Sequence, residues 1–245
     1  MARYALAQHV FICVNGDHLV ILDLKADRYW ALPRAQTNGI GAWVGGWPVA
    51  TSATSEPAEV LQSTEAGAAS ETEEALELLR ERGILVDANG SGKDATPVVA
   101  IAPARELISD SATPAGPSLG SWFTFVRACV FAKLALKVFP FERVIRRVRR
   151  RKAGSPVGNA GDLDRARKLV EAFTRFRVFA FTSKDECLFD SLALLEFLSR
   201  YGIYPDWVFG VQTRPFAAHC WVQQGDIVFN DTVEHVTGYT PIMVV

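Results

Sequence analysis

Long hydrophobic runs, metal-binding cysteine spacings and a phosphate-binding glycine motif are all missing from this sequence. No uninterrupted apolar run approaches the roughly 20 residues that span a bilayer, so we predict no transmembrane segment. The N-terminus lacks a long apolar stretch and a small-residue cleavage site, so we expect no signal peptide. The four cysteines show no CxxC spacing, and we therefore expect no metal site. No GxxxxGK motif occurs, so any ATP site should lie in another protein.

The chain also lacks a strong net charge, at −1 over 245 residues, although its charges are unevenly distributed. At 49% hydrophobic residues it can bury a core, and it is long enough for two small domains. The cysteines show no disulfide framework, which indicates a reducing compartment. We expect the protein in the cytoplasm.

What the chain does contain is a cysteine, a histidine and an aspartate, in the order typical of cysteine-nucleophile hydrolases. Cys187 opens an apolar, helix-like run, and Ser183 or Asp185 could cap that helix. In the first turn of a helix the dipole favours a negative sulfur, and the thiolate is the attacking species. Cys187 is therefore a candidate nucleophile.

His219 and Asp231 lie on two strand-like runs, 217–222 and 227–232, joined by a turn at 223–226. We expect a hairpin with the two side chains opposite one another, so that the carboxylate orients the imidazole. A lone helical cysteine is more often a small buried hydrophobe, but the joint arrangement favours catalysis. Cys220 should face away from His219 and contribute only packing.

The local sequence around these residues resembles the lasso-peptide biosynthesis B proteins, which are leader peptidases with a transglutaminase-like fold. The resemblance implies that Cys187 is the nucleophile, His219 the general base and then acid, and Asp231 the orienting carboxylate. It also implies an asparagine-synthetase-like cyclase as partner, through which any ATP dependence would arise. The segments that carry it occur in order at 187–194, 201–203, 208–211, 215–222, 230–232 and 239–242.

The N-terminal part predicts three strands, at 10–14, 19–24 and 28–32, with an Asn-Gly turn after the first. Helices at 37–47 and 71–82 and a short strand at 84–86 should follow. This order resembles the PqqD-like winged helix-turn-helix, which implies that an edge strand binds the leader peptide as an added strand. Tyr29 and Trp30 are candidate leader contacts, although both could equally be core aromatics, and the module could merely buttress the protease.

Nucleic-acid binding is not expected of this module. The run 37–47 contains no lysine or arginine, and the helix at 71–82 begins with glutamates at 71, 73 and 74. Duplex binding requires neutralisation of phosphates, which these segments cannot supply.

A Gly/Ser/Pro/Ala-rich tract at 91–120 predicts a flexible linker, and 50–70 predicts a loop. From Trp122 the chain becomes aromatic and basic, and Pro140 should divide it into two helices. We predict a buried stripe formed by Phe131, Leu134, Val138 and Phe141. The basic stretch 143–152 is either a solvated helix face or a contact with a partner enzyme, and we do not expect a membrane partner.

The predicted class is α+β, with a PqqD-like domain at 1–90, a linker at 91–120 and a cysteine peptidase domain at 121–245. In the last domain an amphipathic helix at 162–181 completes the helices that precede an antiparallel sheet. The function that follows is an endopeptidase that removes the leader of a lasso precursor before macrolactam formation. Two alternatives are a non-catalytic scaffold that delivers the precursor to the cyclase and another acyl transfer, such as transglutamination, on the same three residues.

Overall fold

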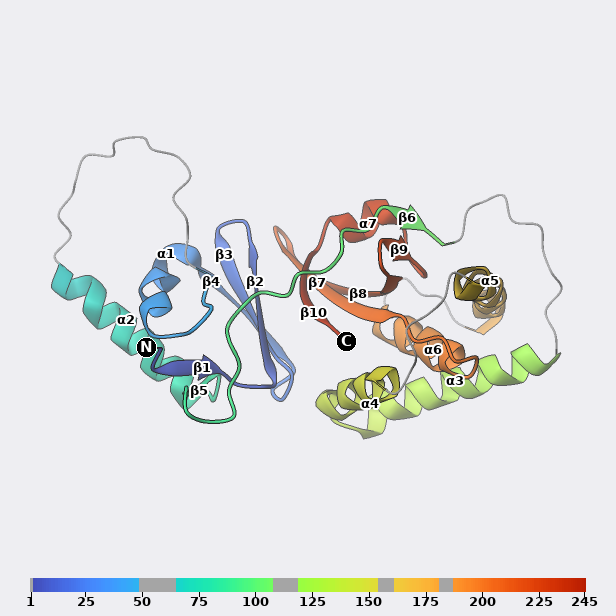
Figure 1. Ribbon diagram of the computed structural model, residues 1–245, viewed down its shortest axis with the longest axis horizontal. Coiled ribbons are helices and arrows are strands. Elements are labelled where there is room, and N and C mark those ends of the chain that lie inside the picture. Colours follow the sequence, from blue (N-terminus) through green and yellow to red (C-terminus); the bar gives the residue numbers. More distant parts are fainter. Residues whose placement is uncertain (1, 49–64, 108–118, 154–160, 181–186) are drawn as a thin grey trace. The chain divides into compact units, whose positions relative to one another are not determined.

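The computed structural model describes residues 2–48, 65–107, 119–153, 161–180 and 187–245 (Figure 1). It divides into two compact units. The first comprises residues 1–98 with 213–215, and the second comprises residues 99–212 with 216–245.

A three-stranded antiparallel sheet forms the centre of the first unit, which confirms the predicted meander. Its strands occur in the order β2 (Val10–Asn15), β3 (His18–Asp23) and β4 (Arg28–Pro33), so that β4 is an edge strand. Gly16, with φ of 56°, occupies the turn between β2 and β3, a conformation that costs glycine little. The central strand is buried on both faces from Leu19 to Leu22.

Outside that sheet, the predicted strand near residue 85 exists but pairs with an earlier strand that sequence reasoning missed. β5 (Leu85–Asp87) is antiparallel to β1 (Tyr4–Leu6). α2 (Glu65–Glu81) packs its buried Leu76 and Leu79 into the same hydrophobic cluster as Ile12, Ile21 and Ile40. Of the predicted loop 50–70, residues 65–70 belong to α2, and the others up to residue 64 lie outside the described residues.

The predicted helix at 37–47 is wrong in its bounds. Instead, α1 (Arg34–Thr37) is followed by a short 3-10 helix, η1 (Asn38–Ala42). Glycines at 39, 41, 45 and 46 weaken any longer helix, and Gly46 has a φ of 74° that a helix does not allow. The unit thus opens with four strands before its first helical turn, and its winged helix-turn-helix character remains a prediction.

The second unit begins its helical part with α3 (Leu119–Val138), α4 (Phe141–Ala153), α5 (Gly161–Ala180) and α6 (Cys187–Ser199). Pro140 separates α3 from α4 as expected. α6 is the central helix, because every side chain from Asp190 to Leu198 is buried. Aromatic contacts join its neighbours to it: the Phe125 and Phe173 rings lie 5.3 Å apart, and Phe173 and Phe197 lie 5.6 Å apart.

The predicted buried stripe is wrong for two of its four members, because Phe131 and Phe141 are half-buried whereas Leu134 and Val138 are exposed. Leu134 is 54% exposed and Val138 is 64% exposed, whereas the buried side chains are Phe125, Ala128, Ala132 and Ala135. Small alanine side chains allow α3 to pack closely against α6, and this packing decides which face turns inward. Among the described residues, α3 is the helix long and apolar enough to cross a membrane by length and composition.

A five-stranded sheet completes the second unit, in the order β10 (Thr240–Val244), β7 (Asp206–Thr213), β8 (Phe216–Gln224), β9 (Ile227–Val228) and β6 (Arg105–Glu106). β10 is antiparallel to β7, and β9 is antiparallel to β8. The expectation of helices followed by a purely antiparallel sheet needs correction, because β6 precedes the helices and pairs in parallel with β9. The fold is nevertheless a mixture of helices and sheet, with the short helix α7 (Val233–Thr237) before β10.

The predicted linker at 91–120 forms backbone hydrogen bonds at several of its described residues. Lys93 and Leu6 exchange two backbone hydrogen bonds of 2.8 Å in the first unit, and Ala95 is fully buried there. In the second unit the Leu107 N–H donates to the Val228 carbonyl at 2.8 Å. Backbone hydrogen bonds thus hold this tract at these described positions, despite its linker-like composition.

Candidate active site

Cys187 is the first residue of α6, and its thiol is half-buried. The predicted caps Ser183 and Asp185 lie outside the described residues. Three groups hydrogen-bond to the Cys187 sulfur: the Cys220 thiol, the His219 side chain and the Cys220 backbone N–H. Since the first N–H groups of a helix have no partner within it, the sulfur also lies at the positive end of the helix dipole.

His219 and Asp231 form a direct hydrogen bond, with 2.5 Å between Nε2 of His219 and Oδ2 of Asp231. Because Asp231 uses Nε2, the nitrogen left for the sulfur of Cys187 is Nδ1. The structure thus brings together the three side chains that the sequence identified, from α6, β8 and the bend that follows β9.

The expected hairpin is shorter than predicted. β9 ends at Val228, where the side-chain oxygen of Asn230 accepts the Val222 N–H at 2.8 Å. This side chain replaces a backbone carbonyl and ends the strand ladder. Asp231 therefore reaches His219 from a bend beyond the strand and is not a paired strand residue.

The hydrogen bonds of this cluster shift the ionisation of its members. The Cys220 thiol, His219 and the Cys220 N–H lower the pKa of Cys187 to about 4, against the opposing effect of burial. Burial lowers the pKa of His219, but bonds to Asp231 and Cys187 outweigh it and raise that pKa to about 9. Burial of Asp231 is outweighed by its bond to His219, so that its pKa is lowered. Between about pH 4 and about pH 9, therefore, Cys187 is a thiolate and His219 is an imidazolium.

Cys220 has a larger role than the packing that we predicted. It lies in the buried part of β8, 3% exposed, and burial raises the pKa of its thiol well above the ordinary value. It therefore keeps its proton at neutral pH and donates a hydrogen bond to Cys187. This donor stabilises the negative sulfur, and the high pKa argues against Cys220 as a second nucleophile.

His235 is a site residue that sequence reasoning missed. Its Nδ1 lies 3.0 Å and 3.1 Å from the two carboxylate oxygens of Asp231, and its ring lies 4.6 Å from that of His219. Thr232 caps α7 by accepting the His235 N–H at 3.2 Å. The signal was available in the sequence, because a Thr232 cap predicts a helix that places His235 one turn after Asp231.

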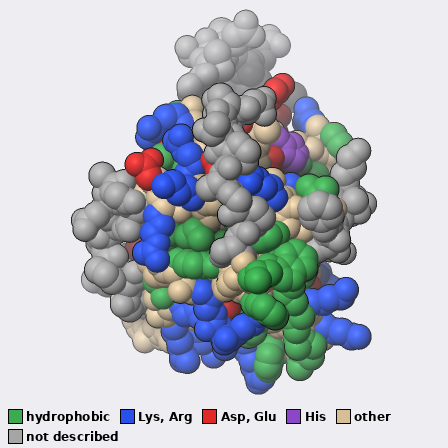
Figure 2. Space-filling model, turned by 90° about the vertical axis from the view of Figure 1, so that its right-hand side faces the viewer, with side chains coloured by type: hydrophobic (Ala, Val, Ile, Leu, Met, Phe, Trp, Pro, Cys, Tyr) green, Lys and Arg blue, Asp and Glu red, His purple; other side chains and the backbone are tan. Residues whose placement is uncertain are grey.

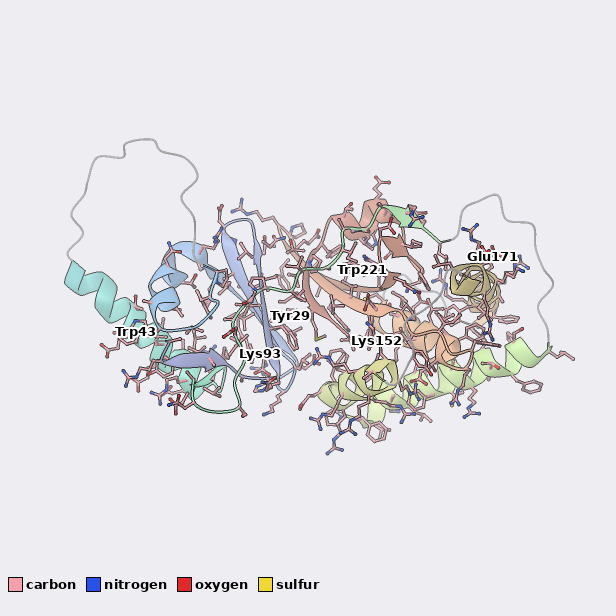
Figure 3. The ribbon with its side chains drawn as sticks, in the orientation of Figure 1. Tyr29, Trp43, Lys93, Lys152, Glu171 and Trp221 are labelled. Carbon is pink, nitrogen blue, oxygen red and sulfur yellow. The ribbon has the colours of Figure 1, made fainter. Side chains whose placement is uncertain are left out.

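Two aromatic rings enclose the imidazole. The His219 ring stacks with Trp221 at 6.0 Å and lies 5.1 Å from Tyr239; Figure 3 labels Trp221 on β8. Gly210 on β7 allows the Trp221 ring and the Cβ of Tyr239 to approach, because a Cβ at position 210 would lie 2.8 Å from the Tyr239 Cβ and 2.9 Å from the Trp221 ring. A glycine at this position is thus required by close packing beside the site.

A buried polar network holds α6 against the strand ends. Asp190 accepts hydrogen bonds from Arg177 at 3.0 Å and from the Asn230 amide at 2.9 Å. The Ser191 hydroxyl donates to the Cys220 carbonyl at 3.2 Å. These contacts connect residues just after Cys187 with residues beside His219 and Asp231, so they fix the spacing of the three candidate catalytic groups.

The cluster could also bind a metal ion. His219, Asp231 and His235 offer ligand atoms that all lie within 4.8 Å of one another. The same atoms also form the hydrogen bonds between Asp231 and the two histidines. The expectation that the protein uses no metal remains a prediction.

The candidate leader-binding residues Tyr29 and Trp30 lie side by side on the edge strand β4, and both are half-buried. Trp30 packs against the hydrophobic cluster of the first unit, and the Arg82 guanidinium lies 5.8 Å from its ring centre. Tyr29 points to the other face of the sheet, because side chains alternate along a strand.

Residues 126–244 match the family model described as the transglutaminase-like superfamily. The chain therefore carries a transglutaminase-like domain, which contains all three candidate catalytic residues. Comparisons with curated proteins and with solved structures gave no match. A transglutaminase-like domain fits a cysteine peptidase or an acyltransferase type of activity.

Asp190→Ala should destabilise the protein by roughly 3 kcal/mol, because it leaves the Arg177 charge and the Asn230 amide without their buried acceptor. Asp190→Asn should cost clearly less, since it keeps one acceptor oxygen. Urea unfolding of both variants measures the difference. A loss for Asp190→Ala no larger than that for Asp190→Asn would contradict the assigned role of this carboxylate.

Proposed function

We propose that this protein is a cysteine endopeptidase that removes the leader peptide of a lasso precursor before a partner cyclase forms the macrolactam. The observation that carries the proposal is the pairing of Cys187 with His219, with Asp231 behind the imidazole. The resemblance of the segments around these residues to the lasso B proteins supports the choice of substrate. The transglutaminase-like domain supports the chemistry.

In the proposed reaction the Cys187 thiolate attacks the carbonyl carbon of the scissile peptide bond. The backbone N–H of Cys187, at the open start of α6, is a candidate donor to the developing oxyanion. The His219 imidazolium then gives its proton to the leaving amine, which departs as the core peptide with a free N-terminus. Neutral His219 next removes a proton from water, whose oxygen attacks the thioester and releases the leader and the thiolate.

Asp231 and His235 support the base in this reaction. The carboxylate of Asp231 holds Nε2 of His219, so Nδ1 faces the sulfur and the imidazolium is stabilised. His235 binds the same carboxylate and restricts its rotation. The proposed mechanism requires neither a metal nor a bound cofactor.

We propose that the first unit is a PqqD-like module that binds the leader at the edge strand β4. An extended peptide could add to this edge through main-chain hydrogen bonds, while side-chain contacts give selectivity. Tyr29 and Trp30 are both candidate contacts, on opposite faces of this edge strand, and Trp30 also packs against the hydrophobic cluster of the unit. Binding there would raise the effective concentration of the scissile bond at Cys187.

The expected partners are the precursor and an asparagine-synthetase-like cyclase in the cytoplasm. Any ATP requirement for cleavage would act through that cyclase. The sequence gives no reason to expect a nucleic-acid partner.

Incubation of the purified protein with the precursor, with and without the cyclase and ATP, tests the proposal by mass spectrometry. Wild type should release the leader, and Cys187→Ala should not. Equal cleavage by both proteins, or binding of the precursor without cleavage in every mixture, would exclude Cys187 catalysis and favour the non-catalytic scaffold. Attachment of an added amine to the leader in place of water would identify an acyl transferase.

Leader binding at β4 predicts that Tyr29→Ala weakens affinity for a fluorescent leader peptide by about tenfold, measured by anisotropy. Phe11→Ala on β2, the opposite edge of the same sheet, is the matched control and should change affinity by less than about twofold. Equal losses in the two variants, or no loss with Tyr29→Ala, would argue against β4 as the binding edge.

A further inference from the structure

One face of α3 is apolar although it is exposed. Leu119 is 81% exposed, Phe123 is 72% exposed and Val130 is 53% exposed, and Val126 and Leu134 lie on the same face. These five positions follow the helical repeat along most of a 20-residue helix, about 30 Å long. A solvent-facing helix normally carries polar residues there, and a contiguous apolar patch of this kind marks an interaction surface. We name these five residues the α3 ridge.

The charged side chains of α3 and α4 are mostly basic. α3 contains Arg127, Lys133 and Lys137 and no acidic residue, and all three cations are exposed. α4 adds seven basic residues against one acidic residue, Glu142, which pairs with Arg146 at 2.6 Å. Figure 2 shows hydrophobic side chains gathered on one face, with Lys and Arg side chains beside them.

A groove between α3 and α4, lined by residues outside the α3 ridge, also contains both apolar and basic side chains. It has a volume of about 600 Å³, and its apolar lining includes Phe131 of α3, Phe139 between the two helices and Val144 of α4. Leu192 and Glu196 of α6 also line it, and Glu196 pairs with Arg151. Five arginines of α4 also line it, at positions 143, 146, 147, 150 and 151. Among the described residues, Arg143 and Arg150 take part in no ion pair. The groove therefore fits a ligand with a phosphate group and an apolar tail.

We propose that the α3 ridge and the basic face of α4 bind the surface of an anionic lipid bilayer. A raised apolar helix face enters the boundary between headgroups and acyl chains, while long Lys and Arg side chains reach the phosphates beside it. Anionic lipids supply the complementary charge. Nucleic acid would match the arginines but would leave the apolar ridge without a partner.

This attachment is interfacial and does not require α3 to span the bilayer. The opposite face of α3 is held in the protein core, where Phe125 lies 5.3 Å from Phe173 and 5.4 Å from Phe176. Only the outer face of the helix is free to enter lipid. Membrane attachment would add to the proposed peptidase function and does not depend on it.

Sedimentation with phosphatidylcholine vesicles, with and without phosphatidylglycerol, tests the proposal on the full chain. Wild type should bind the anionic vesicles at least about tenfold more strongly than the neutral ones, and added salt should weaken this binding. Arg143→Glu/Arg150→Glu should reduce it by about tenfold or more. Phe123→Glu/Val130→Glu should also reduce it, because it removes the apolar contact.

Lys25→Glu/Arg200→Glu is the matched control, since it changes net charge equally at exposed positions outside the surface. It should bind anionic vesicles within about twofold of wild type. Circular dichroism verifies that each variant is folded. Absence of wild-type binding, or equal loss in the control, would overturn the proposal. A wild-type dimer that Phe123→Glu/Val130→Glu dissociates, with no vesicle binding, would instead identify a contact between copies.

Discussion

The hydrogen bond between His219 and Asp231 is the contact on which the geometry of the candidate active site depends. It fixes which imidazole nitrogen faces Cys187, and it helps to raise the pKa of His219, whose imidazolium acts together with the Cys220 thiol to lower the pKa of Cys187. The bond requires β8 and the bend after β9 to meet within hydrogen-bonding distance, and Cys187 at the start of α6 must lie beside His219. The remaining contacts of the second unit can be understood as the means of holding these three elements together.

Each candidate catalytic residue is positioned by its neighbours in sequence. Asp190 and Ser191 follow Cys187 and bind Asn230 and the Cys220 carbonyl, while Asn230 and Cys220 adjoin Asp231 and His219. The buried network therefore links the same three segments of the chain that carry Cys187, His219 and Asp231. Burial makes such bonds costly to leave unmade, so the arrangement resists displacement of any one member.

Sequence alone predicted features that local physics determines. The meander β2 to β4 follows from the alternation of its side chains and from a turn glycine, and the break at Pro140 follows from its missing N–H. Features fixed by distant contacts were missed: the alanine face of α3 packs inward because of α6, and β6 joins the sheet through β9. His235 was missed because α7 was not predicted, and the role of Cys220 required the proximity of Cys187.

The rate at which iodoacetamide alkylates Cys187, measured against pH by peptide mass mapping, tests the thiolate–imidazolium pair most directly. Because the pKa of Cys187 is lowered to about 4, the rate should rise through that pH and reach a plateau well below neutrality. His219→Ala should move the rise to higher pH, since it removes one of the groups that stabilise the thiolate. A wild-type rise only near pH 9, the ordinary value for a cysteine thiol, would contradict the account.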